Sequence, residues 1–110
     1  MPAPKLPASV RIGHRKFTIK RATVKELGED TLGDISTLRA TIRIRKDLLP
    51  QDAADTMLHE VYHGCWPPVP KSLPHEDVEE YVVTALAENT AQVWRDNPAL
   101  VAWISHNLGD

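Results

Sequence analysis

The first strands of the chain are indicated by an alternation of apolar and polar residues. Between residues 10 and 21 the apolar positions are Val10, Ile12, Phe17 and Ile19. Alternation of this kind is typical of strands with one buried face. Gly13 and the two residues after it interrupt the run. The pattern therefore predicts a hairpin of two short strands with its turn at residues 13–15.

A third strand is predicted at residues 38–45, where the alternation is strict. One side of this strand would present Leu38, Ala40, Ile42 and Ile44. The other side would present a threonine and three arginines, so one face is expected to be buried and the other solvated. Residues 26–37 contain two glycines and two aspartates, and are predicted to be a loop.

After Pro50 the apolar residues recur at helical spacing. A first helix is predicted from about Gln51 to about Cys65. Four prolines between residues 67 and 74 then exclude a helix, and a second helix begins near Pro74. The second helix is expected to stop at Asn97, which would cap a short third helix over residues 98–108. The predicted fold is α+β: a small three-stranded, mostly antiparallel sheet, followed by two long helices and a short C-terminal one.

The composition is that of one globular domain. The chain has 110 residues, of which 42% are hydrophobic and 25% charged. Residues 1–9 contain three prolines and are expected to form a flexible arm, and residues 10–110 a single domain. The longest mostly apolar run, 81–87, is far too short to span a membrane, and the arm lacks an apolar signal segment. With a single cysteine as well, the expected location is the cytoplasm.

Charge is divided unevenly between the two halves of the chain. Residues 11–46 contain ten basic and four acidic side chains, a net charge of +6, and residues 47–110 have a net charge of −9. A basic half can face an anionic partner such as nucleic acid. It can equally be the solvated outer face of a sheet, which we weighted more because no nucleic-acid-binding motif accompanies it.

The predicted first helix contains the motif HExxH, as His59-Glu60-Val61-Tyr62-His63. Residues four apart lie on the same helix face, so the two imidazoles of His59 and His63 can bind one Zn²⁺. Glu60 lies beside them, where it could act as general base on a metal-bound water. The competing interpretation is an exposed helix with two unremarkable histidines.

A catalytic zinc usually has a third protein ligand, and the second helix offers three glutamates. Glu79 falls at the centre of that helix's apolar arc, where an unpaired carboxylate is costly. We therefore prefer Glu79, with Glu80 in reserve and His75 as a less favoured choice. No residue is clearly suited to stabilise an oxyanion; Tyr62, Tyr81 and His75 are weak choices, and Tyr62 is expected to pack between helices. The three tryptophans are expected to anchor the core, and Cys65 to pack in it.

The stretches TMLHEVYH and LAENTAQVWRDNP resemble small zincin-like proteins encoded by bacteriophages and prophages and, more distantly, SprT-like and ImmA/IrrE-type metallopeptidase domains. The resemblance covers roughly residues 10–108. It implies a zincin-like fold, zinc bound by His59, His63 and Glu79, and peptide-bond hydrolysis with water activated by Glu60. It also implies that strand 38–45 is an edge strand that pairs with a peptide or protein substrate.

A second function remains open beside the metallopeptidase. The chain would then be a catalytically inactive zincin-fold binding module, whose basic residues 11–46 hold a protein or nucleic-acid partner. The small size, the basic half and the missing oxyanion group motivate this alternative.

Overall fold

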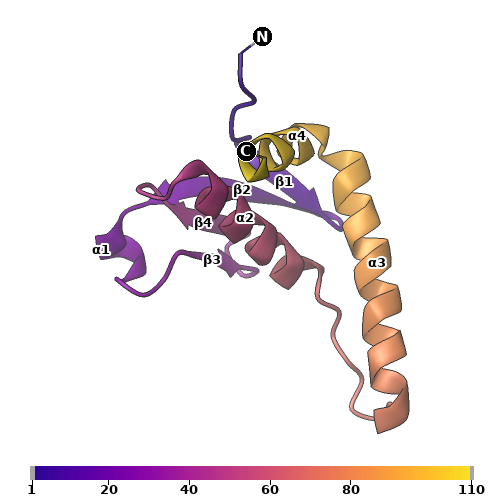
Figure 1. The fold of residues 1–110 in the computed structure, drawn as a ribbon. Helices are drawn as coiled ribbons and strands as arrows, with labels where there is room; N and C mark the ends of the chain where they lie inside the picture. The colour runs from indigo at the N-terminus through magenta and orange to yellow at the C-terminus, as the bar shows by residue number, and fades with distance from the viewer. Residues whose placement is uncertain (1, 110) are drawn as a thin grey trace.

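The computed structural model describes residues 2–109 and is an α+β domain (Figure 1). Four strands come first: β1 (Ser9–Ile12), β2 (Arg15–Ala22), β3 (Gly33–Ser36) and β4 (Thr41–Arg45). A single-turn helix, α1 (Val24–Leu27), follows β2. The long elements come afterwards: α2 (Pro50–Cys65), the 3₁₀ turn η1 (His75–Asp77), α3 (Val78–Asp96) and α4 (Pro98–Leu108).

The sheet is mixed and has the strand order β1-β2-β4-β3. The β1–β2 hairpin is antiparallel, with Ile12 opposite Arg15, as the alternation predicted. β4 pairs parallel to β2 and antiparallel to β3. The inward side chains of β2 and β4 are apolar, so this face of the sheet is covered by α2. The other face presents mainly basic and hydroxyl side chains.

The core lies between the sheet and helices α2 and α4. Its largest fully buried side chains include Ile42 and Ile44 from β4, Met57 and Val61 from α2, and Leu100 from α4. Burial of each such side chain contributes roughly 1.5–3 kcal/mol to folding. Leu6, in the predicted N-terminal arm, also packs against this core. Cys65 is buried at the end of α2, in agreement with the packing role expected for it.

The prediction of three strands was wrong, because residues 26–37 are not all loop. Gly33–Ser36 forms β3, whose short run with one isoleucine shows too little alternation to indicate a strand. The strand predicted at 38–45 begins only at Thr41. Residues 37–40 form the turn between β3 and β4: Ala40 has φ 50°, and Leu38 is 89% exposed. β4 is therefore an inner strand, and the edge strand beside α2 is β3.

Two of the three tryptophans do not anchor the core. Trp103 on α4 is buried, but Trp66 is 58% exposed and Trp94 is 36% exposed. The reason is the course of α3, whose first half extends away from the body of the domain (Figure 1). Tyr62, expected between helices, is exposed for the same reason.

The second half of α3 is tied to the sheet through polar side chains. Asn97 accepts a hydrogen bond from the backbone N–H of Arg11 at 2.8 Å and donates one to its carbonyl at 2.8 Å. Gln92 accepts from Gly13 N–H at 2.7 Å. Asn97 is thus the N-cap residue of α4 by position, but its side chain pairs with β1 instead of capping. Among the described residues, no helix is both long and apolar enough to cross a membrane.

Candidate metal and catalytic site

The two histidines of the HExxH motif lie together on the exposed face of α2. Their Nε2 atoms are 3.1 Å apart, and the rings meet edge to face with centroids 4.7 Å apart. Two nitrogens that bind one zinc at about 2.0–2.1 Å in tetrahedral geometry lie about 3.3–3.4 Å from each other. The pair is therefore nearly set for a shared metal. Without a metal, the same distance suits an N–H···N hydrogen bond between two neutral imidazoles.

Glu60 points to a different side of α2 and is only 6% exposed. Burial raises the pKa of its carboxyl, and the nearby charge of Asp34 raises it further. Any positive charge on His59 or His63 acts in the opposite direction and lowers this pKa. A carboxyl with a raised pKa accepts a proton more readily, which is the property that a general base needs.

A cavity of about 310 Å³ opens beside Glu60, between α2 and the sheet edge. The α2 side is lined by Asp55, Thr56, His59 and Glu60. The opposite side is lined by residues 30–33, which lead into β3. The contribution of this segment was missed from the sequence, where it looked like loop. Its signal would have been Gly33, since the α2–β3 approach leaves no room there for a side chain.

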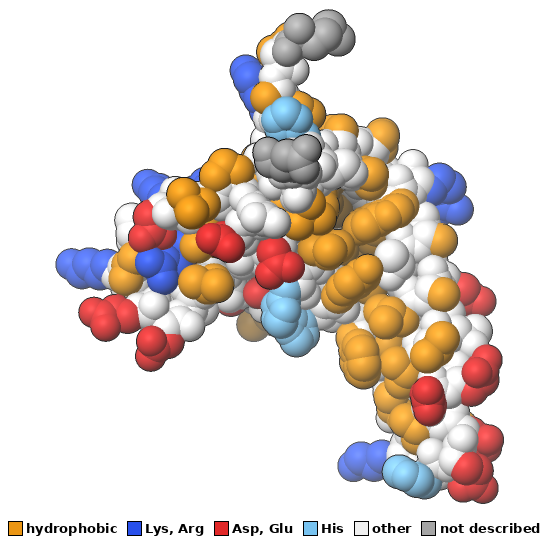
Figure 2. Space-filling view, in the orientation of Figure 1, with side chains coloured by type: hydrophobic (Ala, Val, Ile, Leu, Met, Phe, Trp, Pro, Cys, Tyr) orange, Lys and Arg blue, Asp and Glu red, His pale blue; other side chains and the backbone are white. Residues whose placement is uncertain are grey.

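Four ring-bearing residues form a second exposed feature on α2. His59, Tyr62, His63 and Trp66 are spaced i, i+3, i+4 and i+7 and therefore share one face of the helix. They line a hollow of about 170 Å³ next to the imidazole pair. In Figure 2 the histidines on α2 and an apolar strip along α3 border the same open concavity. We call these four residues the α2 ring face.

The third ligand predicted on α3 does not lie beside the histidines. Glu79 and Glu80 are exposed in the first turn of α3. Helix α3 meets α2 at Asn89, whose side chain donates to the carbonyl of Cys65 at 2.9 Å. Glu79 is ten residues before Asn89, which is about 15 Å along the helix axis. Within residues 2–109, no group of three His, Cys, Asp or Glu side chains is close enough together to hold a metal ion.

The other proposed site residues are spread over the surface. His75 is exposed in η1 and, like Glu79, is distant in the fold from α2. Tyr81 is exposed on α3, where it lines a hollow with Leu73 and Glu80. Only Tyr62 lies next to the histidines, as part of the α2 ring face. Of the oxyanion choices, Tyr62 alone is therefore within the site.

Comparison with known proteins identifies no relative: no family model, curated protein or solved structure matches this chain. The function must therefore be argued from the geometry of the site.

Proposed function

We propose that the protein is a zinc-dependent peptide hydrolase, with His59, His63 and Glu79 as zinc ligands and Glu60 as general base. The observation that carries the proposal is the 3.1 Å separation of the two Nε2 atoms on one helix face. Exposed histidines with no shared ligand have no need to converge, because each is satisfied by water. A buried carboxyl next to the pair is the second support, since burial is costly for a group without a role.

The imidazole pair suits zinc, which favours nitrogen ligands and takes three protein ligands in catalytic sites. The metal, when bound, would polarise the scissile carbonyl and lower the pKa of water. Glu60 would take a proton from the attacking water and give it to the leaving amine nitrogen. Tyr62 is the one phenol beside the histidines, and its hydroxyl is the available donor to the developing oxyanion.

The substrate that this site favours is an extended peptide. β3 is an edge strand that pairs only with β4, so its outer backbone groups can add a further strand. The segment leading into β3 lines the same cavity as Glu60. A peptide paired with β3 would therefore run past the general base.

Glu79 can join the histidines only if the first half of α3 moves towards α2. The apolar residues Val82 and Leu86 continue the stripe of buried Val93 along α3, and Glu79 is near the same stripe. Such a movement would bring this stripe against the exposed α2 ring face. Covering two apolar surfaces would offset part of the cost of the movement.

Zinc titration of the purified apo-protein against a chromogenic chelator tests the proposal. We expect one zinc per chain, lost in His59→Ala and His63→Ala. Glu79→Ala should weaken binding by more than the roughly 10–100-fold typical of a lost supporting group. Glu80→Ala is the matched control, because it removes the neighbouring carboxylate, and should bind as the native chain does.

Hydrolysis of a labelled unstructured protein then tests the chemistry. Glu60→Gln should keep its zinc but lose activity, because an amide cannot accept the proton. Equal zinc binding by native chain and His59→Ala/His63→Ala would overturn the metal site. Zinc binding without hydrolysis by the native chain would instead favour the inactive binding module, in which the fold holds a partner.

A further inference from the structure

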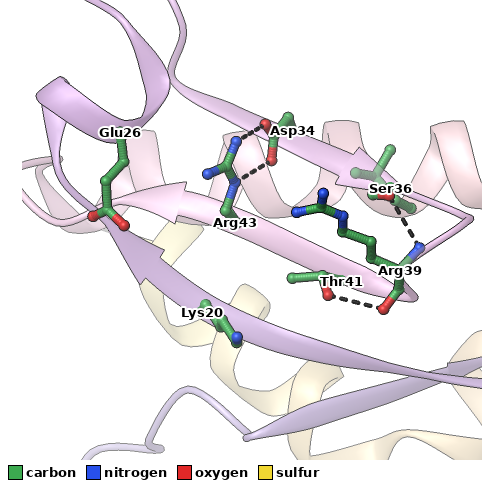
Figure 3. Close-up of a pocket in the computed structure, with 8 residues that line it drawn as sticks. Lys20, Glu26, Asp34, Ser36, Arg39, Thr41 and Arg43 are labelled. Carbon is green, nitrogen blue, oxygen red and sulfur yellow. Dashed lines mark hydrogen bonds and ion pairs between the residues drawn. The ribbon is translucent and has the colours of Figure 1, made fainter.

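The outer face of the sheet is uncovered, and its side chains are arranged in rows across the strands. In one row, Lys20 on β2 is in register with Arg43 on β4, which is in register with Asp34 on β3. In the next row, Thr18 is in register with Thr41, and Thr41 with Ser36. The helices lie on the opposite side of the sheet, behind it in Figure 3. This face therefore combines cations and hydroxyls with open access.

These rows border a cavity of about 390 Å³. Its lining contains three cationic side chains, from Lys20, Arg39 and Arg43. Arg39 extends from the β3–β4 turn across the sheet towards Arg43 (Figure 3). The Ser36 hydroxyl accepts the Arg39 backbone N–H at 3.1 Å, which leaves its own proton available to a ligand. The cavity thus presents donors from three sides.

The acids at the cavity are already engaged. Asp34 forms a two-point ion pair with Arg43, which keeps the pKa of Asp34 below its usual value. Glu26 accepts hydrogen bonds from the backbone and hydroxyl of Thr23, at the N-cap of α1, and its pKa is lowered as well. In contrast, the side-chain nitrogens of Lys20 and Arg39 have no hydrogen-bond partner among the described residues. The unneutralised charge of the cavity is positive.

We propose that this outer sheet face binds the phosphate backbone of double-stranded nucleic acid, with one phosphate in the cavity at Lys20 and Arg39. A single small phosphorylated ligand would need only the cavity, but cations continue beyond it at Lys16, Arg21 and Lys46, all exposed. The acidic residues of the second half lie mainly on the helices, on the other side of the sheet. The molecule is thus polarised so that the sheet faces a polyanion.

The lack of aromatic side chains favours a duplex over a single strand. Single strands are bound largely by stacking of bases on aromatic rings. Phe17 is the one Phe, Tyr or Trp in residues 1–61, and it is buried. A face with cations and hydroxyls alone contacts phosphates, so binding should be independent of sequence and sensitive to salt.

Fluorescence anisotropy with a labelled DNA duplex of arbitrary sequence tests this surface, at salt concentrations from about 50 mM to 200 mM. The test pair is Lys20→Gln/Arg39→Gln. The matched control is Lys71→Gln/Arg95→Gln, which removes the same charge from the only two basic residues after Lys46. We expect the test pair to weaken binding at low salt about tenfold and to reduce the salt slope by about two. The control should change affinity less than about twofold.

Each further arm separates this surface from another explanation. A single strand of equal length should bind more weakly than the duplex, and His59→Ala should bind as the native chain does, because this surface does not depend on zinc. Absence of duplex binding at low salt would overturn the proposal. So would equal weakening by the test and control pairs, or binding of inorganic phosphate alone at the cavity with no binding of the duplex.

Discussion

Asp34 shows how one side chain on β3 acts on both surfaces of the domain. On the outer face it holds Arg43 through two hydrogen bonds. Its negative charge also raises the pKa of Glu60, which lies towards α2. Asp34 thus reduces the free positive charge of the outer face and favours the proton-accepting character of Glu60.

The Asp34–Arg43 pair makes stability depend on pH. The pKa of Asp34 is lowered in the folded protein, so its contribution to stability is present above its unfolded pKa of about 3.9. The contribution is lost as the pH falls through the lower, folded pKa. Asp34→Asn should therefore reduce the free energy of unfolding at pH 7 by less than about 1 kcal/mol, because both side chains are about one-third exposed or more.

Urea denaturation of the native chain and Asp34→Asn, at pH 7 and at the lowest pH at which both fold, measures this effect. The difference between the two proteins should shrink in acid. An unchanged difference at both pH values would mean that packing of Asp34, and not its charge, stabilises the fold.

At the scale of elements, two glycines determine how closely β3 and β1 approach α2. A Cβ at Gly33 would come within 2.7 Å of the Arg43 backbone oxygen and 2.8 Å of the Thr56 side chain. A Cβ at Gly64 would meet only the tips of Ile12 and Ile35, at 2.8 and 3.1 Å. A carbonyl in a strand cannot move without disturbing the sheet, whereas an isoleucine tip can rotate.

We therefore expect Gly33→Ala to lower the free energy of unfolding by about 1–3 kcal/mol. Gly64→Ala should have a net effect within about 1 kcal/mol, because its clash is offset by the gain in helix propensity of roughly 1 kcal/mol. Chemical denaturation of the two variants provides the comparison. A larger loss for Gly64→Ala would show that the α2–β3 contact is more yielding than its geometry indicates.

The same contact explains what could be predicted from sequence. The hairpin and helices α2, α3 and α4 have clear periodicity, and their positions were predicted to within a few residues. β3 was missed because it has four residues, and its pairing with β4 and its approach to α2 arise from tertiary structure. The turn at Leu38–Ala40 was taken for strand because its alternation continues that of β4.

For the site, local spacing sufficed where all the residues are on one helix. His59, Glu60 and His63 occur on α2 as HExxH spacing requires, with the two imidazoles together. The third ligand depends on how α3 packs, and helical periodicity does not fix how far one helix extends past another. The stripe that includes Glu79 does face the concave side, but the part of α2 that could cover it ends about 15 Å away along the axis.

At the scale of the whole molecule, the first half of α3 is the least supported element. Its second half is held by Asn89, Gln92 and Asn97, whereas residues 78–88 contain no fully buried side chain. Helical segments with few buried contacts open locally at low free-energy cost. The part of the protein that must move to complete the proposed zinc site is thus the part least restrained by packing.

Hydrogen exchange tests this link between α3 and the site. Without zinc, amides of residues 78–88 should exchange faster than those of residues 89–96, because opening the first half breaks no buried contact. Saturating zinc should slow exchange at 78–88 in the native chain, since a ligand that binds only the closed form stabilises it. In Glu79→Ala the zinc-dependent slowing should disappear, and in Glu80→Ala it should persist. If zinc binds to His59 and His63 but leaves exchange at 78–88 unchanged, α3 supplies no ligand and the third position belongs to water or to the substrate.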